Sequence, residues 1–260
     1  MSGATLFLFA HQDDEVAVFH CIEKELRQGH RVVCAFLTDG GSAATPPRVR
    51  NLESLAALSR LGVAGDDVLF IGEAAGIRDL HLYESLDVAY AGLAESLQSS
   101  LGMVGAIYAP AWEGGHPDHD ATHLVARKLA ASLAQECAVW QFSIYHGENC
   151  PGPFFKVLSP LKNNGPVLKE QIPWHKRWQY LAFALRLYPS ARRTWLGLMP
   201  FLTYHYLVHG CQSLQRADNV LCRPHSGELY YEKRGFARFE EFWAVTAPFR
   251  GLLEKKGATG

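Results

Sequence analysis

Residues 6–15 read Leu-Phe-Leu-Phe-Ala-His-Gln-Asp-Asp-Glu, an apolar run followed at once by a histidine and three acids. The run LFLFA at 6–10 has no helical periodicity, so it predicts a buried β-strand. Residues 15–28 place apolar side chains three and four positions apart, which predicts an amphipathic helix. The polar stretch therefore occupies a loop that leads from a buried strand into a helix.

The first 150 residues repeat this alternation of apolar runs and helical periodicity. Further strands are predicted at 31–38, 67–72, 104–110 and 138–145, and further helices at 51–62, 83–98 and 120–135. Continuous apolar strands alternating with helices indicate an α/β fold, with a mostly parallel sheet covered by helices on both faces. In such sheets the ligand site lies beyond the carboxyl ends of the strands, where the strand-to-helix loops gather.

From about residue 151 onward the pattern is less regular. Helical stretches rich in aromatic residues and arginine are predicted at 174–187, 192–209 and 238–246. No long polar linker divides the chain, so residues 1–260 are predicted to form a single domain. Within it, residues 1–150 form the core and residues 151–260 a helical or irregular C-terminal extension or cap.

The composition restricts the classes of partner. The chain has 260 residues, 48% of them hydrophobic, and a formal net charge of -1, which argues against general nucleic-acid binding. No apolar stretch has the length of a membrane span, and the N-terminus lacks the basic region of a signal peptide. Six scattered cysteines without a CxxC indicate reduced thiols and a cytoplasmic protein. Exposed aromatic residues in the last third are compatible with a homo-oligomer.

Two pairs of residues, each three positions apart, follow predicted strands. His11 and Asp14 lie after the first strand, and His116 and His119 lie after the strand at 104–110. Side chains three apart share a face in the first turn of a helix, so each pair could reach one ion. Imidazole and carboxylate ligands suit zinc, and His11, Asp14 and His119 would form a set of three that leaves one position for water. His123, one turn further on, is interpreted as a helix surface residue.

The two remaining polar residues then acquire roles in hydrolysis. Asp13 could accept a proton from a zinc-bound water, whose pKa falls to about 7. His116 could donate a proton to the leaving group or stabilise an oxyanion. A cation would also compensate the repulsion between Asp13, Asp14 and Glu15. The alternatives are acids at a solvated helix N-terminus and histidines that satisfy core hydrogen bonds.

The motifs AHQDDE at 10–15 and GGHPDHDATH at 114–123, in that order, carry a family resemblance. The sequence resembles the PIG-L/LmbE-like family of zinc-dependent N-acetylglucosaminyl deacetylases, whose usual signature reads AHPDDE and HPDH. The resemblance extends over at least residues 5–125 and includes the TDGG that follows the second strand. It implies a Rossmann-like three-layer sandwich, and the removal of an N-acetyl group from an N-acetylglucosamine-type sugar or glycoconjugate.

The resemblance also implies roles for individual residues. Residues matching His11, Asp14 and His119 hold Zn²⁺, with Fe²⁺ as the alternative metal. The residue matching Asp13 is the general base, and the residue matching His116 contacts the oxyanion or donates a proton.

Two further positions match substrate contacts of the family. Arg50, in Arg50-Asn51-Leu52-Glu53, is similar to an arginine that contacts substrate, and Asp79 is similar to an aspartate that holds a sugar hydroxyl. From the residues alone, Arg50 could equally be an exposed arginine at a helix start and Asp79 a helix N-cap.

The sequence departs from the family pattern at two positions. Gln12 replaces the proline of the motif, so the turn before Asp13 loses a fixed φ, although the ligand types remain. Gly114 stands where the mycothiol-pathway deacetylases carry a mobile tyrosine. The role of that tyrosine would be missing, or supplied by another residue such as Trp112 or Glu113.

Three functions are therefore weighed. The first is zinc-dependent deacetylation of an amino sugar, and the second is hydrolysis of a non-sugar N-acyl metabolite at the same metal. The third is a metal- or nucleotide-binding module without turnover. No GxGxxG follows the first strand, and its acidic loop would repel a pyrophosphate, so a nucleotide site is disfavoured.

Overall fold

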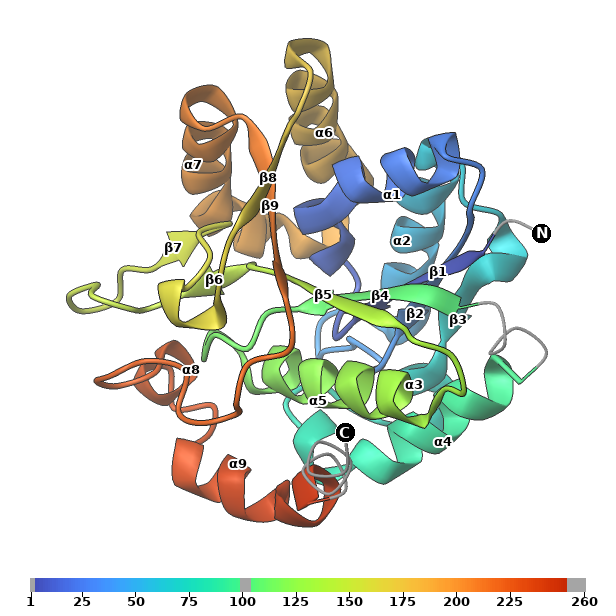
Figure 1. The fold of residues 1–260 in the computed structure, drawn as a ribbon. Helices are drawn as coiled ribbons and strands as arrows, with labels where there is room; N and C mark the ends of the chain where they lie inside the picture. The colour runs from blue at the N-terminus through green and yellow to red at the C-terminus, as the bar shows by residue number, and fades with distance from the viewer. Residues whose placement is uncertain (1–2, 99–103, 252–260) are drawn as a thin grey trace.

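The first strand lies inside a mixed sheet of seven strands in a computed structural model that describes residues 3–98 and 104–251. The strand order is β3-β2-β1-β4-β5-β9-β8 (Figure 1). The parallel strands are β1 (Ala4–Phe9), β2 (Arg31–Phe36), β3 (Val68–Phe70), β4 (Val104–Pro110) and β5 (Ala138–Phe142). Two antiparallel strands follow, β9 (Cys211–Arg216) on β5 and β8 (Leu168–Gln171) on β9.

Helices cover both faces of this sheet, as the sequence predicts. One face packs against α1 (Phe19–Arg27), α2 (Pro47–Leu61), α6 (Trp174–Leu187) and α7 (Arg192–Val208). The other packs against α4 (Leu86–Ser96), α5 (Pro117–Ser132) and α9 (Phe239–Val245). The shorter helices are α3 (Ile71–Ala75) and α8 (Tyr230–Lys233), and a small hairpin joins β6 (Tyr145–His146) to β7 (Lys156–Val157). Figure 1 shows the three resulting layers.

The apolar run of β1 explains why the sheet is buried on both faces. Successive side chains of a strand point to opposite faces. Leu6 and Leu8 accordingly join the core beneath α4 and α5, while Phe7 and Phe9 join the core beneath α1, α2 and α6. All four side chains are fully buried. A strand buried on both sides needs an unbroken apolar run, which is the pattern that the sequence carries.

The C-terminal third differs from its prediction in one respect. The helices predicted at 174–187, 192–209 and 238–246 are present as α6, α7 and α9, with closely similar bounds. The strands β8 and β9 were not predicted, because their sequences, LKEQ and CQSLQR, are polar and short. β9 pairs with the edge of β5, where Trp140 and Gln141 face Arg216 and Gln215, and β8 pairs with β9. The extension is thus hydrogen-bonded into the sheet of the core.

The strand order determines where the site forms. β1 lies between β2 and β4, so the chain leaves β1 and β4 beside each other at the same edge of the sheet. The loop after β1 and the start of α5, which follows β4, therefore meet although about a hundred residues separate them. This is the place where open α/β sheets bind ligands. Across the described parts of the chain, no helix combines the length and the apolar character that a membrane crossing demands.

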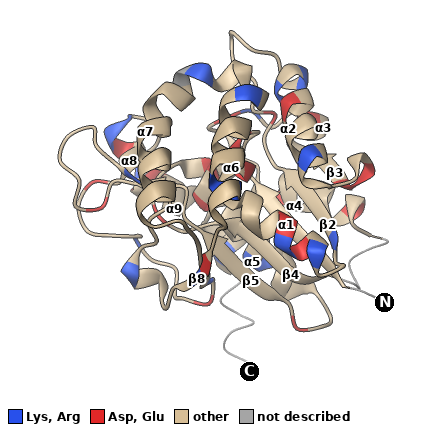
Figure 2. Cartoon of the chain, turned by 90° about the horizontal axis from the view of Figure 1, so that it is seen from above, with Lys and Arg blue, Asp and Glu red and all other residues tan. Residues whose placement is uncertain are grey.

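Charged side chains are mixed over the outside of the molecule. Figure 2 shows positive and negative residues interspersed over the helices that are visible from above. Because long-range fields of opposite sign largely cancel on such a surface, charge selection of a ligand depends on the groups inside a pocket.

Candidate active site

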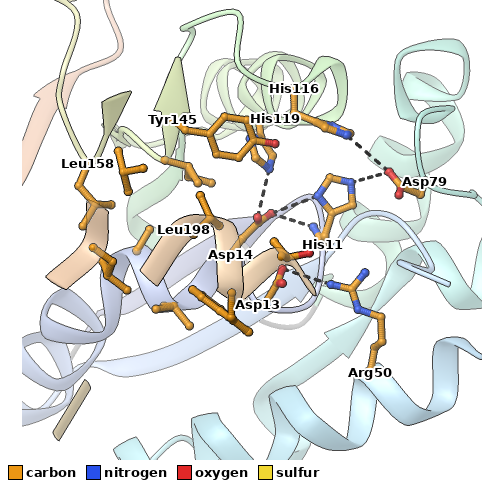
Figure 3. Close-up of a pocket in the computed structure, with 17 residues that line it drawn as sticks. His11, Asp13, Asp14, Arg50, Asp79, His116, His119, Tyr145, Leu158 and Leu198 are labelled. Atoms are coloured by element: carbon orange, nitrogen blue, oxygen red, sulfur yellow. Dashed lines mark hydrogen bonds and ion pairs between the residues drawn. The ribbon is translucent and has the colours of Figure 1, made fainter. Parts of the chain in front are cut away.

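The loop after β1 has an unusual backbone at the residue predicted to be the base. Asp13 has φ 104°, in the left-handed region that non-glycine residues rarely adopt. Its N–H donates to Oε2 of Glu15 at 2.8 Å, and Arg50 donates to the carbonyl of Gln12 next to it. Such a conformation costs on the order of 1–3 kcal/mol and persists only where the surroundings impose it. The turn sends Asp13 and Asp14 in different directions (Figure 3).

Gln12 stands at the position where the family motif has a rigid proline, and its side chain connects this loop to α2. Its buried side chain donates to Oδ1 of Asn51 at 2.5 Å and to the carbonyl of Asp39 at 3.3 Å. Side-chain hydrogen bonds thus replace the restriction that a proline ring would impose. The loop keeps its course despite the departure from the motif.

Asp14 lies between the two histidines with which it was predicted to act. Its Oδ1 is 3.1 Å from Nε2 of His119, and its Oδ2 is 3.7 Å from Nδ1 of His11. Oδ2 also accepts the N–H groups of Ala10 and His11, at 3.0 and 2.8 Å. All three side chains are buried. The structure therefore brings His11, Asp14 and His119 together from two distant loops (Figure 3).

The ring of His11 is oriented from behind by Asp118, a residue that the sequence reasoning missed. Nε2 of His11 is 3.2 Å from Oδ2 of Asp118, which also accepts the N–H of Leu80, while Oδ1 accepts the N–H of Leu82. The carboxylate accepts a hydrogen bond from Nε2–H, which leaves Nδ1, the ring nitrogen that faces Asp14, available as a ligand atom. A carboxylate behind a metal-binding histidine is a common arrangement. In the sequence, Asp118 can be recognised as the acid directly before the predicted ligand His119.

His116 lies on the other flank of the cluster as the N-cap of α5. The N–H of Asp118 donates to its Nδ1 at 3.2 Å, so the ring proton is on Nε2. Burial, together with the neighbouring rings of His11 and His119, lowers the pKa of His116 well below its ordinary value. A neutral imidazole with an Nε2–H is a hydrogen-bond donor at neutral pH. Of the two predicted roles, this state favours oxyanion stabilisation over proton transfer.

The donor set fits a divalent cation. Ligand atoms of His11, His116 and His119 lie within 4.8 Å of one another, and an overlapping group combines His11 and His116 with Asp79 and Asp118. The carboxylate of Asp118 in the second group is already occupied by two backbone N–H groups. The predicted ligand set, Nδ1 of His11, Asp14 and Nε2 of His119, lies on the other side of His11 and stays a prediction. Two imidazoles and one carboxylate are a donor set typical of zinc.

Asp13 and Arg50 form an ion pair at the edge of this cluster, with Oδ1 and a guanidinium nitrogen 3.2 Å apart. Burial raises the pKa of Asp13 to about 6, and the charge of Arg50 opposes that rise. Arg50 also donates to the carbonyl of Gly40 at 2.6 Å. Its guanidinium thus binds the loop and the predicted base, and the contact with substrate that the resemblance implies stays a prediction.

Asp79 lies opposite Asp13, with Oδ1 3.0 Å from Nε2 of His11 and 3.7 Å from Nε2 of His116. Burial raises its pKa, but the neighbouring histidines outweigh burial and hold it below the ordinary range. The side chain remains 40% exposed, so it can accept a further hydrogen bond from a ligand.

Glu15, the third acid of the opening stretch, is turned away from the cluster. Its carboxyl is fully buried, accepts the hydroxyl of Tyr188 at 2.9 Å and accepts the N–H of Asp13. Hydrogen bonds therefore stabilise this group, so the expectation that a cation compensates all three acids does not extend to Glu15 and stays a prediction for Asp13 and Asp14.

A pocket that is partly open to solvent extends from the cluster. Its wall has two chemically different parts. The polar half consists of Asp13, Arg50 and Asp79. The apolar half is formed by Trp195, Leu198 and Leu202 of α7, and by Ile144, Val157 and Leu158 around the β6–β7 hairpin.

Tyr145 is a pocket residue that the sequence reasoning missed. Its ring is 5.4 Å from that of His119, and its hydroxyl is directed toward the cluster (Figure 3). The candidates Trp112 and Glu113 are wrong, because both side chains are buried and neither lines the pocket. A side chain at Gly114 would bring its Cβ within 2.8 Å of Leu229, so the glycine suits this packing.

His123 is also placed differently from its prediction as a surface residue. The ring is fully buried, and its Nδ1 lies 3.1 Å from the carbonyl of Pro110. Burial lowers the pKa of His123 to about 3, so the ring is a neutral structural group.

Comparisons with known proteins give a family match and a shared fold. Residues 6–130 match the profile of the PIG-L family, described as GlcNAc-PI de-N-acetylase. No curated protein matches the chain by sequence.

Solved structures share the fold at low sequence identity. The deacetylase of the teicoplanin biosynthesis pathway is 17% identical, with a TM-score of 0.58, over 84% of this chain and 100% of that one. The N,N'-diacetylchitobiose deacetylase of Pyrococcus horikoshii is 18% identical, with a TM-score of 0.61, over 83% and 84%. The 4-carboxy-2-hydroxymuconate hydratase of Pseudomonas putida is 16% identical, with a TM-score of 0.52, over 85% and 98%.

The family match over residues 6–130 supports a metal-dependent N-deacetylase as the class of protein. More particularly, residues 6–130 match the PIG-L family model, which confirms the resemblance carried by the motifs AHQDDE and HPDH.

Proposed function

We propose that the protein is a zinc-dependent hydrolase that removes the N-acyl group, acetyl in the simplest case, from an N-acetylglucosamine-type sugar or glycoconjugate. The observation that carries the proposal is the convergence of His11, Asp14 and His119 with Asp13 beside them. The family description, a de-N-acetylase of an N-acetylglucosamine lipid, supports the reaction class.

The metal, when bound by these three residues, would lower the pKa of water and polarise the amide carbonyl. Asp13 faces the pocket and accepts the proton of the attacking water at its carboxylate. Arg50 favours the ionised form of that carboxylate, because the two charges lie 3.2 Å apart. Protonated Asp13 is then the group that returns a proton to the leaving amine.

Two hydrogen-bond donors flank the position where the carbonyl oxygen becomes negative. His116 presents its Nε2–H, and it is a neutral donor for the reasons given above. Tyr145 presents a hydroxyl from the opposite strand hairpin, and burial raises its pKa well above the ordinary value, so it keeps its proton. Donors positioned in this way stabilise an oxyanion. Tyr145 thereby takes the place of the tyrosine that is absent at Gly114.

The polar half of the pocket suits the sugar. Asp79 has exposed carboxylate surface for a sugar hydroxyl, and Arg50 lies across from it. A buried site that hydrogen-bonds a hydroxyl discriminates strongly against an analogue without it.

The test is metal analysis of the purified protein, followed by acetate release across a panel of N-acetylated amino sugars. We expect stoichiometric zinc or iron and acetate release that chelation abolishes. If the metal-loaded protein releases no carboxylic acid from any member of the panel, the proposal is wrong and a binding module is favoured.

A non-sugar N-acyl metabolite is the second candidate, and the apolar half of the pocket is the observation in its favour. A hydratase shares the fold, so the fold alone does not determine the reaction. Substitution of Asp79 distinguishes the candidates. Asp79→Asn should raise KM for N-acetylated sugars and leave KM for simple amides unaffected if the substrate is a sugar.

A further inference from the structure

The two halves of the pocket lie on opposite sides of the metal cluster. In Figure 3, Leu158 and Leu198 are on one side of Asp14, and Asp79 and Arg50 are on the other. The apolar half is built by segments that come from outside the motif loops, namely the β6–β7 hairpin and α7.

The apolar half is formed by one face of α7. Trp195, Leu198 and Leu202 are three and four positions apart, which is the spacing of one helical face. Trp195 and Leu202 are buried, and Leu198 is partly buried. Leu158 and Ile144 close the pocket from the hairpin side, and both are buried. Residues 194–208 of α7 contain no Lys, Arg, Asp or Glu.

An amide has two substituents, and its carbonyl carbon must lie at the metal cluster to be hydrolysed. The nitrogen substituent then extends to one side and the acyl substituent to the other. A sugar needs hydrogen-bonding partners for its hydroxyls, so it belongs in the polar half. The acyl substituent is therefore directed along the face of α7, where a methyl group alone would contact only part of the apolar lining of the pocket.

We propose that this pocket is an acyl subsite, and that the preferred substrate is an amino sugar with a medium-chain N-acyl group longer than acetyl. The proposal rests on the hydrolysis proposed above and specifies its substrate. Burial of a methylene in such a wall strengthens binding by about two- to fourfold, so the gain accumulates along the chain until the wall ends.

Two isomers provide the test. N-octanoylglucosamine and hexyl N-acetylglucosaminide have the same composition, but six added carbons lie on the amide in the first and on the anomeric oxygen in the second. We expect kcat/KM for the octanoyl compound to exceed that for N-acetylglucosamine by on the order of a hundredfold. The hexyl glycoside should gain much less. A preference for the hexyl glycoside would assign the apolar half to an aglycone and overturn the proposal.

A matched pair of substitutions on α7 locates the effect. Leu198→Trp places a larger side chain in the pocket, and it should shift the preference from octanoyl toward acetyl. Leu196→Trp makes the same change at a side chain that is 80% exposed, and it should leave the chain-length preference as it is. Melting temperatures report whether both variants are folded. If both variants have the same ratio of kcat/KM for octanoyl over acetyl substrate, an acyl subsite on this face of α7 is contradicted.

Binding separates failure of this proposal from failure of the proposed function. The zinc-loaded Asp13→Asn variant should bind N-octanoylglucosamine far more tightly than N-acetylglucosamine in calorimetry, whether or not either compound is hydrolysed. If acetate is released but affinity and kcat/KM are independent of chain length, hydrolysis stands and the acyl subsite does not. If neither compound is hydrolysed, the proposed function fails, and the binding comparison alone decides on the subsite.

Discussion

The polar and apolar halves of the pocket are built in opposite ways. The predicted metal ligands and the polar half come from the loops after β1 and α3 and from the starts of α2 and α5, and their side chains are held by hydrogen bonds to backbone groups and to one another. The apolar half comes from α7 and the β6–β7 hairpin, and its side chains are held by packing. Directional bonds can orient a reacting group, whereas packing provides a surface of suitable shape. We therefore expect substitutions in the two regions to affect different quantities.

The largest effect is expected at Asp13. Asp13→Ala should lower kcat by about 10²–10⁴, because the variant loses its general base but keeps all three predicted metal ligands. Turnover and metal content are measured on the same preparation. Normal turnover in a metal-loaded variant would show that another group accepts the proton.

The corresponding substitution in the apolar half should act mainly on stability. Leu202 is 2% exposed and packs in the core beneath α7. Leu202→Ala should reduce the free energy of unfolding by about 2–5 kcal/mol, since it leaves a cavity. Denaturant titration measures this value, with Leu196→Ala as the exposed control on the same helix. Similar losses in both variants would mean that this face of α7 is not packed as described.

Substitution of Asp118 tests whether its hydrogen bond to His11 affects metal affinity. Asp118→Asn retains the shape but removes the charge that orients His11, and we expect about 10- to 100-fold weaker zinc binding. Asp120→Asn is the matched control, because Asp120 is equally buried and accepts the N–H groups of Glu113 and Gly114 away from the cluster. Competition with a metal-binding dye gives both affinities. If the control weakens zinc binding as much as Asp118→Asn, the assignment of Asp118 is contradicted.

Glu113 hydrogen-bonds the backbone of the segment that carries Ile144 and Tyr145, and its titration should make the free energy of unfolding depend on pH. Its carboxyl accepts the N–H groups of Ile144 and Tyr145, at 2.7 and 2.9 Å, and burial raises its pKa from 4.5 to about 8. The folded protein therefore binds this proton more tightly than the unfolded chain does. The stabilisation is complete below pH about 4.5 and is lost as the pH rises through about 8.

Denaturant unfolding between pH 5 and 9 measures this dependence. Glu113→Gln should flatten it, because the amide does not titrate. An unchanged slope in the variant would assign the pH dependence to other groups.

The smallest effect concerns the backbone of Asp13. Glycine tolerates φ 104° and alanine does not, so Asp13→Gly should be more stable than Asp13→Ala by about 1 kcal/mol. Both variants lose the same carboxylate, and the comparison isolates the strain of the turn. Equal stability would indicate that this strain is not imposed by the fold.

The core of the fold and the meeting of the two motif loops could be predicted because the patterns that indicate them are local in the sequence. The run LFLFA predicted β1, and the spacing of apolar residues predicted α6 and α7 with bounds close to the observed ones. The pairs His11/Asp14 and His116/His119 each occupy a strand-to-helix loop, and parallel strands bring such loops to one edge.

Residues whose role depends on a distant partner were missed or misread. Asp118 orients His11 across 107 positions of sequence, and Tyr145 reaches the pocket from the hairpin after β5. His123 was assigned to the surface because nothing in its own helix shows that Pro110 and the sheet cover it. Glu15 was grouped with the acids of the site, although it hydrogen-bonds Tyr188, 173 positions away.

By itself the sequence determined the alternation of strands and helices and the identity of the predicted metal ligands, because strand burial, helical periodicity and ligand chemistry are properties of neighbouring residues. Only the tertiary structure decided which ring nitrogen faces Asp14, that Tyr145 lines the pocket beside His119, and that α7 forms one wall of the pocket. Those features depend on contacts between segments far apart in the chain, and no local pattern encodes the direction from which a distant side chain arrives.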